Sequence, residues 1–432
     1  MTAINETHDP ALRSWVEAAN VAGTDFPIQN LPHGVFRRRG TNEPWRGGVA
    51  IGESIVDMAQ ASALEVFSPS PRLAAQAAGA STLNALMALG PGHWHALRAE
   101  LSRLLRTGSP HQARLREALV PIGQAQFALP ARIGDYTDFF TSWHHMVNAG
   151  AIFQPGAPPL PQFNWLPIAY HGRASTVEVS GADVRRPCGQ TRPRAGAAAP
   201  QFEPTRCLDY ELELALWIGP GNERGRLIPI AEAEGHVFGV GLLNDWSARD
   251  VQGWESMPLG PFLAKNFLTS VSPWIVTLEA LEPFRCPLPG AVHDAPLPYL
   301  RPARADAGID LQLEAWLQTA GGAGPARLSR TSFRHCGWSI AQLVAHHTEG
   351  GCSLRSGDLL GTGTQSGPGE GEQGCLLELT RHGSMPLVLP GGERRSYLED
   401  GDTVILRAWA ERLGAMRIGF GECRGTVLSL DQ

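Results

Sequence analysis

The run of residues 208–216 constrains the fold most strongly, because polar and apolar residues alternate along it. A period of two is typical of a β-strand, with Asp209, Glu211 and Glu213 on one face and leucines on the other. Carboxylates two positions apart on a strand lie about 6.5–7 Å apart and point the same way. A row of like charges needs water or a cation to balance it. The run therefore predicts a strand whose acidic face is either solvated or part of a cation site.

The length and composition of the chain predict a two-domain protein rich in turns. A chain of 432 residues is too long for one ordinary hydrophobic core. Its 49 glycines and 34 prolines favour short strands joined by turns over long helices. We expect a mostly β (α+β) fold with a small domain over residues 1–122 and a large domain over residues 123–432.

Charge, hydropathy and cysteine usage exclude several classes of protein. The net charge is −6 and no block of lysines or arginines occurs, which argues against binding to nucleic acid or to an anionic membrane. No apolar run approaches 18 residues, and the polar N-terminus does not resemble a signal peptide. The seven cysteines are scattered without a CxxC motif, so neither a disulfide framework nor a structural zinc site is expected. These features predict a cytoplasmic protein.

Hydrophobic periodicity predicts several local elements. Residues 49–57 have the pattern of a tight hairpin, and leucines at helical spacing predict a helix over residues 91–106. A second helix is predicted over residues 339–347. The large domain is expected to be dominated by strands, of which the clearest are residues 274–278, 310–316, 375–379 and 403–409.

Acids, histidines and glycines gather in four segments. They are residues 134–145, the acidic run itself, residues 244–269, and residues 357–364 with the following Glu378. Each segment also has a purely structural interpretation: an aspartate that caps a turn, surface histidines, an Asp–Arg pair that stabilises a loop, or glycines that a turn requires. No GxSxG elbow and no GxxxxGK[ST] loop occurs, so a serine nucleophile and a phosphate-binding loop are not supported.

Convergence of the acids would create a metal site. Asp138, Glu211, Glu213 and Asp245 would then form an all-oxygen ligand set, which suits a hard divalent cation such as Mg²⁺ or Ca²⁺. Four carboxylates and one divalent ion leave two negative charges, which nearby cations must balance. Lys265 and Arg249 are the obvious candidates.

Several long motifs together resemble one known family, the fumarylacetoacetases. They are residues 25–32, 133–139, 169–175, 244–250, 258–263 and 419–423, and the resemblance runs nearly end to end. It implies a small N-terminal SH3-like barrel, a C-terminal β-roll domain that carries the active site, and a homodimer. It also implies a metal-dependent hydrolase that cleaves a C–C bond of a small β-diketo acid.

The resemblance implies a role for each candidate residue. Metal ligands would be Asp138, Glu211, Glu213 and Asp245, with Lys265 and Thr269 as further positions associated with the metal. His145 would be the general base that activates water, and Glu378 the acid that orients it. Arg249, Gln252 and Lys265 would stabilise the oxyanion and the departing carbanion.

The substrate contacts match the family only in part. Tyr170, Gln252 and Thr364 agree with its pattern, whereas Phe140, Gln154 and Ser256 stand where the family commonly has Tyr, Arg and Tyr. Neutral Gln cannot grip a carboxylate bidentately as Arg does.

Three functions follow from the resemblance. The first is hydrolysis of 4-fumarylacetoacetate to fumarate and acetoacetate, the last step of tyrosine and homogentisate catabolism. The second is hydrolysis of a different β-diketone or acylpyruvate. The third is a non-catalytic protein that keeps the metal only for its structure.

Overall fold

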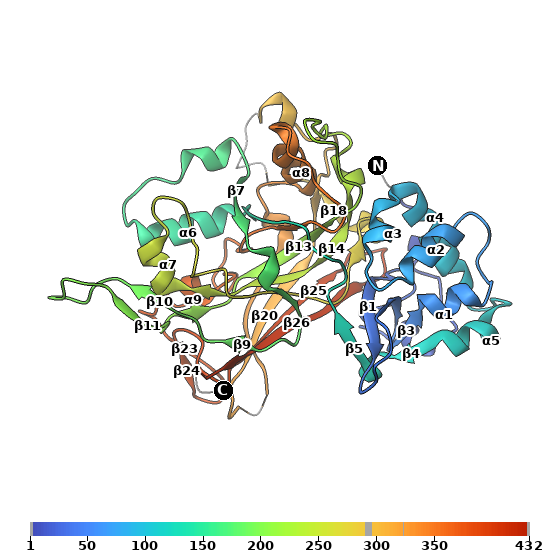
Figure 1. Cartoon of the computed structure of the whole chain (residues 1–432), viewed down its shortest axis with the longest axis horizontal. Helices are drawn as coiled ribbons and strands as arrows, with labels where there is room; N and C mark the ends of the chain where they lie inside the picture. Colours follow the sequence, from blue (N-terminus) through green and yellow to red (C-terminus); the bar gives the residue numbers. More distant parts are fainter. Residues whose placement is uncertain (1–2, 290–295, 323, 430–432) are drawn as a thin grey trace.

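The structure is a computed structural model of the chain that describes residues 3–289, 296–322 and 324–429. It is mostly β with some helices, which confirms the predicted fold class. An N-terminal part with one sheet and several helices packs beside a larger part built on two sheets (Figure 1). Among the described residues, no helix combines the length and hydropathy that crossing a membrane requires.

The N-terminal part is built on an antiparallel sheet with the strand order β4-β3-β2-β1-β5. Its predicted hairpin is confirmed by the pairing of Ala50 with Ile55. The strands are β1 (His33–Arg38), β2 (Arg46–Ile51), β3 (Ser54–Asp57), β4 (Leu119–Pro121) and β5 (Ala125–Ala128). The helices are α1 (Met58–Ala63), α2 (Arg72–Ala78), α3 (Asn84–Ala88), α4 (Pro91–Leu105) and α5 (Gln112–Leu115). Helix α4 confirms the helix predicted over residues 91–106, and its leucines are buried.

The larger part contains an eight-stranded and a five-stranded sheet. The first has the order β7-β6-β22-β13-β14-β16-β8, with β17 also paired to β14, and the second has the order β21-β20-β25-β26-β9. The strands of the first are β6 (Tyr136–Phe140), β7 (Ile168–Gly172), β8 (Val177–Val179), β13 (Leu212–Ile218), β14 (Val237–Asp245), β16 (Thr269–Val271), β17 (Val276–Thr277) and β22 (Leu359–Gly361). Those of the second are β9 (Val184–Arg185), β20 (Gln312–Gln318), β21 (Ala326–Ser332), β25 (Thr403–Ala410) and β26 (Ile418–Leu428).

Short strand pairs and helices complete this part. The pairs join β10 (Cys188–Thr191) to β11 (Gln201–Pro204), β12 (Leu208–Asp209) to β15 (Ser247–Ala248), β18 (Arg285–Cys286) to β19 (Gly308–Ile309), and β23 (Leu387–Val388) to β24 (Arg394–Arg395). The helices are α6 (Trp143–Phe153), α7 (Arg249–Glu255), α8 (Ile340–Glu349) and α9 (Leu376–Leu379). Helix α8 confirms the helix predicted over residues 339–347, and Ser339 and Gln342 form a capping box at its start.

The acidic run is buried on both faces. Leu214 and Leu216 share a hydrophobic core with Leu313 and Leu406 of the second sheet. The acidic side chains of the run are buried as well, so the prediction of a solvated strand face is wrong. The run is also not one strand, because β12 ends at Asp209 and β13 begins at Leu212. The interruption follows directly after Asp209, whose carboxylate bonds residues of other elements.

Two predicted strands differ from the structure. Residues 375–379 were expected to form a strand but lie at α9, because the Asp209 carboxylate accepts hydrogen bonds from the backbone N–H groups of Leu376 and Leu377. Those two N–H groups therefore have hydrogen-bond acceptors without a neighbouring strand. The strand predicted over residues 274–278 shortens to β17, whereas β25 closely matches the prediction over residues 403–409.

Candidate active site

A cavity of about 700 Å³ opens in the larger part, beside α6 and α7. Acidic and basic side chains line part of it, and apolar side chains line most of the remainder. Among the predicted site residues, the lining includes Asp138, Phe140, His145, Gln154, Tyr170, Glu211, Arg249, Gln252, Lys265 and Thr364. The predicted residues from distant segments therefore meet at one place.

Four carboxylates cluster beside this cavity, and two of them, Asp138 and Glu211, line it. Asp138 lies on β6, Glu211 precedes β13, Glu213 lies on β13, and Asp245 ends β14. One oxygen atom of each lies within 4.8 Å of an oxygen of every other, and all four side chains are buried. A single cation can therefore reach all four.

Two glycines make this approach possible. Strand β22 lies between β6 and β13 in the sheet, and a Cβ atom at Gly361 would lie 2.5 Å from Asp138 Oδ1. Gly363 has φ +73°, and its N–H donates to Asp138 Oδ1 at 3.2 Å and to Glu213 Oε2 at 2.8 Å. The left-handed backbone at Gly363 thus directs one donor at two carboxylates.

Burial and mutual repulsion disfavour the charged forms of these acids. Burial, followed by the negative charge of Asp245, raises the pKa of Asp138 well above its ordinary value. Burial and then the charge of Asp138 raise the pKa of Glu213 in the same way. Burial also raises the pKa of Asp245, although Lys265 opposes it. These three groups need added positive charge if all are to be ionised.

Lys265 and Arg249 supply part of that charge. The Lys265 ammonium donates to Glu211 and to Asp245 Oδ2, the latter at 2.9 Å. Arg249 Nη1 donates to Glu211 Oε1 at 2.7 Å. Burial opposes ionisation of Glu211, but Lys265 and Arg249 outweigh it and lower its pKa. The pKa of Lys265 is raised because Asp245 and Glu211 outweigh its own burial.

The donor set fits a hard divalent cation. All four groups are oxygen ligands, as Mg²⁺ and Ca²⁺ prefer. Lys265 and Arg249 offset only part of the negative charge of the four acids, since Arg249 also pairs with Asp209, and a divalent ion would offset two further charges. Glu213 Oε1 is buried and has no hydrogen-bond partner among the described residues. A buried oxygen without a donor is the environment that a bound cation would satisfy.

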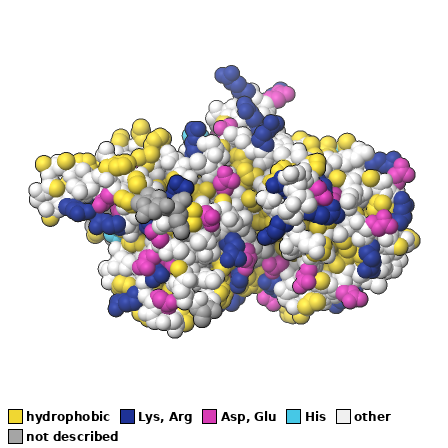
Figure 2. All heavy atoms as spheres, turned by 60° about the horizontal axis from the view of Figure 1, so that its bottom comes forward, with side chains coloured by type: hydrophobic (Ala, Val, Ile, Leu, Met, Phe, Trp, Pro, Cys, Tyr) yellow, Lys and Arg dark blue, Asp and Glu magenta, His cyan; other side chains and the backbone are white. Residues whose placement is uncertain are grey.

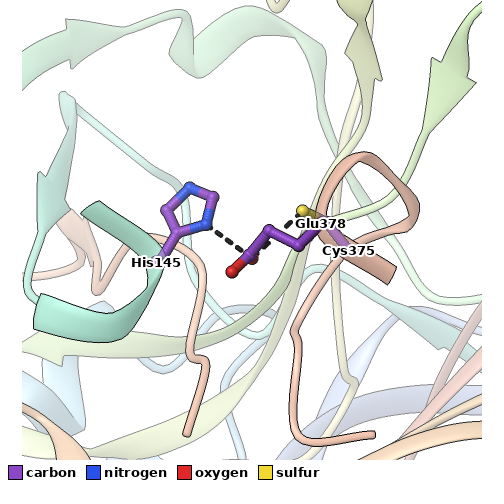
Figure 3. Close-up of side chains that lie close together, drawn as sticks. All are labelled: His145, Cys375 and Glu378. Atoms are coloured by element: carbon purple, nitrogen blue, oxygen red, sulfur yellow. Dashed lines mark hydrogen bonds and ion pairs between the residues drawn. The ribbon is translucent and has the colours of Figure 1, made fainter. Parts of the chain in front are cut away.

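His145 and Glu378 form a buried pair beside these acids. His145 lies on α6, where Ser142 caps the helix, and Glu378 lies on α9. His145 Nδ1 lies 2.6 Å from Glu378 Oε1. Figure 3 shows the imidazole and the carboxylate facing each other, with Cys375 on the far side of the carboxylate. The contact leaves the other ring nitrogen, Nε2, for a partner in the cavity that His145 lines.

Three further donors surround the Glu378 carboxylate. Asn148 Nδ2 donates to Oε2 at 2.7 Å, Ser366 Oγ donates to Oε1 at 2.8 Å, and the Cys375 thiol lies 3.3 Å from Oε1. Burial alone would raise the pKa of Glu378. The charge of His145 and the hydrogen bonds from His145, Asn148 and Ser366 outweigh burial and lower the pKa. The carboxylate is therefore well suited to orient the imidazole.

The remaining predicted residues occupy different positions. Tyr170 and Thr269 both donate to Asp245, at 3.0 and 2.7 Å, so each orients a carboxylate of the cluster. The Thr364 hydroxyl is buried at the cavity wall and has no partner among the described residues. Gln252 accepts a hydrogen bond from Arg249 at 3.0 Å. Ser256 does not line the cavity, and its hydroxyl donates to the Gln252 carbonyl at 2.6 Å.

The other two departures from the family pattern, Phe140 and Gln154, line the cavity. The Phe140 ring meets the His145 ring edge-on, with 5.3 Å between their centroids. Gln154 is exposed at the end of α6. Neither side chain gives the cavity wall a positive charge at these two positions.

Sequence reasoning missed the groups that orient Glu378 and the carboxylate cluster. Asn148 follows His145 by three residues, and that helical spacing is the only local signal for its role. Ser366 and the Gly363 N–H carried no such signal. Both act across contacts between segments that are distant in the sequence.

Comparison with known proteins agrees with this geometry. Residues 29–130 match the family model described as "Fumarylacetoacetase N-terminal", and residues 137–428 match "Fumarylacetoacetate (FAA) hydrolase C-terminal". A fumarylacetoacetase of Oryza sativa subsp. japonica is 46% identical over 424 residues, which cover 96% of this chain and 97% of that protein. A fumarylacetoacetase of Homo sapiens is 44% identical over 415 residues, covering 94% of this chain and 96% of that protein.

A solved structure shares the fold. A fumarylacetoacetate hydrolase from Exiguobacterium antarcticum superposes with a TM-score of 0.50 at 16% identity, covering 92% of this chain and 99% of that one. The two family models together span most of the chain, and the curated relatives match it over nearly their whole length. The chain therefore belongs to the fumarylacetoacetate hydrolase family.

Proposed function

We propose that the protein is a fumarylacetoacetase, which hydrolyses the C–C bond of 4-fumarylacetoacetate to give fumarate and acetoacetate in tyrosine catabolism. One observation carries the proposal: a buried His145–Glu378 pair and a cluster of four carboxylates both reach a single cavity, which His145, Asp138 and Glu211 line. The names of the relatives, at 44–46% identity over nearly the whole chain, support the same reaction.

The cation that the site would bind is Mg²⁺ or Ca²⁺. Asp138, Glu211, Glu213 and Asp245 would hold it, with Thr269 and Lys265 orienting Asp245. When bound, such an ion supplies a Lewis acid that polarises a carbonyl of the β-diketone.

His145 and Glu378 would activate water. Glu378 fixes the imidazole through Nδ1, so Nε2 accepts a proton from water while the water oxygen attacks the substrate carbonyl. The C–C bond then breaks and its electron pair leaves as an enolate. The imidazolium returns the proton to that carbanion, which completes acetoacetate.

Charged and polar groups of the cavity would stabilise the developing negative charge. Lys265 and Arg249 are buried cations at the cavity wall, and Gln252 and Thr364 add neutral hydrogen-bonding groups. Such preorganised donors cost no reorganisation when charge develops in the transition state. Tyr170, Phe140 and Gln154 would contact the remainder of the substrate.

A second candidate is hydrolysis of another β-diketone or an acylpyruvate. It is favoured by Phe140 and Gln154, which place neutral side chains at cavity positions where the family commonly has Tyr and Arg. Ser256, the third departure, lies on α7's C-terminal side, outside the cavity lining.

The test is an assay of purified protein with 4-fumarylacetoacetate, followed by its ultraviolet absorbance. We expect turnover that stops with a chelator and returns with Mg²⁺ or Ca²⁺. An acylpyruvate is assayed in parallel. The second candidate would be favoured if 4-fumarylacetoacetate were turned over at least about a thousandfold more slowly than the acylpyruvate. That factor is equivalent to about 4 kcal/mol of transition-state stabilisation.

We also propose that the protein acts as a homodimer. Large apolar side chains are exposed in the segments that line the cavity, and we name five of them the apolar rim: Leu160, Trp254, Met257, Leu259 and Phe262. Figure 2 shows hydrophobic side chains gathered toward the end of the molecule where Figure 1 places α6, α7 and the β10–β11 pair. A contiguous exposed apolar patch is typical of a protein interface.

Finer points of the architecture stay predictions. We propose an SH3-like barrel for the first sheet, supported by its five antiparallel strands, and a β-roll for the two larger sheets. The division into residues 1–122 and 123–432 and the cytoplasmic location are retained on the sequence alone.

A further inference from the structure

Asp209 is a fully buried carboxylate outside the proposed catalytic and metal-binding sets. It ends β12, is 0% exposed and does not line the cavity. Its oxygens accept four hydrogen bonds: from Arg249 Nε at 2.9 Å, and from the backbone N–H groups of Tyr210, Leu376 and Leu377 at 2.8, 2.8 and 2.9 Å. A side chain with this many partners fixes the relative positions of all of them.

Two of these partners, the N–H groups of Leu376 and Leu377, belong to the helix on which Glu378 lies. The short helix α9 begins after Cys375, whose side chain forms no capping hydrogen bond. Asp209 supplies the missing acceptor from another strand, by bonding the first two N–H groups of the helix. Glu378 follows on the same turn and reaches His145 at 2.6 Å. A shift of Asp209 would therefore be transmitted to the His145–Glu378 contact.

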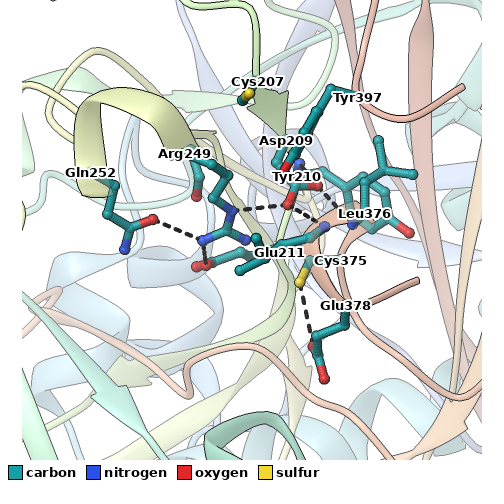
Figure 4. Close-up of polar contacts among 12 residues, drawn as sticks. Cys207, Asp209, Tyr210, Glu211, Arg249, Gln252, Cys375, Leu376, Glu378 and Tyr397 are labelled. Carbon is teal, nitrogen blue, oxygen red and sulfur yellow. Dashed lines mark hydrogen bonds and ion pairs between the residues drawn. The ribbon is translucent and has the colours of Figure 1, made fainter. Parts of the chain in front are cut away.

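The other partner is the cation at the cavity wall. Asp209 holds Arg249 through Nε, while Arg249 Nη1 reaches Glu211 at 2.7 Å and Gln252 at 3.0 Å. Figure 4 shows the Asp209 carboxylate between the Arg249 guanidinium and the start of α9. Arg249 is itself 2% exposed, and Asp209 is the partner that bonds its Nε atom.

We propose that Asp209 is a positioning residue that sets the distance between the general-base pair and the oxyanion-stabilising cation. This inference rests on the proposed function. One carboxylate ties Arg249 to the backbone that carries Glu378, so the two halves of the site cannot move apart independently. A misplacement of about 1 Å in such a site costs about 100-fold in rate.

The experiment compares Asp209→Asn with Asp402→Asn. Asp402 is equally buried and is bonded by Arg395 and by the backbone N–H of Glu399, none of which lines the cavity. We expect Asp209→Asn to lower kcat at least about 100-fold with KM changed less than about threefold, because the ground-state contacts are kept. Asp402→Asn should leave kcat within about threefold of wild type. Equal losses of kcat in the two variants would overturn the proposal.

A double-mutant cycle separates positioning from a general loss of structure. In the Glu378→Gln background, Asp209→Asn should lower kcat by a smaller factor than in the wild-type background, because one of the two groups that it positions is already disabled. An equal cost in both backgrounds would contradict the proposal.

A crystal structure of Asp209→Asn distinguishes this proposal from the proposed function. Displacement of Glu378 Oε1 beyond hydrogen-bond distance of His145 Nδ1, or loss of the contact between Arg249 and Glu211, would support the positioning role even if wild-type protein did not hydrolyse 4-fumarylacetoacetate. If both contacts are unchanged, the positioning role is wrong whatever the wild-type activity.

Discussion

His145 Nδ1 and Glu378 Oε1 lie 2.6 Å apart although the two residues are 233 positions apart in the sequence. Both side chains are buried, and Asn148 and Ser366 also donate to the carboxylate. The arrangement is that of a histidine base oriented by an acid. The first prediction concerns this base.

Replacement of His145 by Ala should remove most of the activity and leave metal binding intact. General-base catalysis contributes about 100- to 10,000-fold, so kcat should fall by that factor. The matched control is His144→Ala, because the neighbouring imidazole does not line the cavity. Steady-state kinetics and calorimetric titration with Mg²⁺ measure the two effects. Near-wild-type turnover by His145→Ala would show that another group is the base.

Replacement of Glu213 by Gln should weaken binding of the divalent ion. Loss of a residue that only hydrogen-bonds a metal ligand lowers the metal affinity about 10- to 100-fold. Loss of a direct ligand should lower the affinity by more than that. Glu314→Gln is the control, because Glu314 is also buried but pairs with Arg327 outside the cavity. Calorimetry gives both affinities. An unchanged affinity in Glu213→Gln would remove Glu213 from the ligand set.

Replacement of Gln154 by Arg should improve binding of a substrate that carries a free carboxylate. A hydrogen bond to a charged group contributes about 1.5–3 kcal/mol, so KM should fall about tenfold or more. Gln162→Arg adds the same charge at a residue outside the cavity lining and should leave KM unchanged. If the two variants behave alike, the substrate carboxylate does not lie near position 154.

Replacement of Leu259 by Asp should dissociate the proposed homodimer. Leu259 is 95% exposed in the apolar rim, and a charge at a buried interface must be desolvated. Leu413→Asp is the control, since Leu413 is equally exposed but lies between β25 and β26. Sedimentation velocity should show a dimer for wild type and for Leu413→Asp. A dimer of unchanged affinity in Leu259→Asp would place the interface elsewhere.

The free energy of unfolding should decrease as the pH is lowered, because of His33. This imidazole is buried on β1, and burial followed by the charge of Arg98 lowers its pKa from 6.5 to about 4. Between these values the unfolded state binds more protons than the folded state. Stability present above pH 6.5 is therefore lost as the pH falls toward 4, by up to about 3 kcal/mol.

Urea unfolding of wild type and His33→Leu at pH 7 and pH 5 measures this contribution. The loss of unfolding free energy between the two pH values should be smaller in His33→Leu. The exposed His171 serves as the control, and His171→Leu should retain the wild-type loss. If His33→Leu lost as much unfolding free energy between the two pH values as wild type does, the pH dependence would come from other groups.

Local patterns of the sequence predicted many of the elements and most of the candidate site. The helices α4 and α8 and the strand β25 follow from hydrophobic periodicity, because their backbone hydrogen bonds and buried faces repeat along the chain itself. The motif residues also indicated which acids could act together. Their convergence was an expectation that depended on residues in four separate segments.

The tertiary structure decided what the local pattern could not. The alternation in residues 208–216 is equally compatible with a solvated face and with a buried one, and only the packing of β13 between two cores buries it. The residues at α9 are apolar enough for a strand, yet the Asp209 carboxylate from a distant segment caps them as a helix. The packing of α6 against α9 also brings Asn148 to Glu378, and Ser366 reaches the same carboxylate from a loop. Such contacts depend on long-range packing, whereas periodicity reports only the preferences of neighbouring residues.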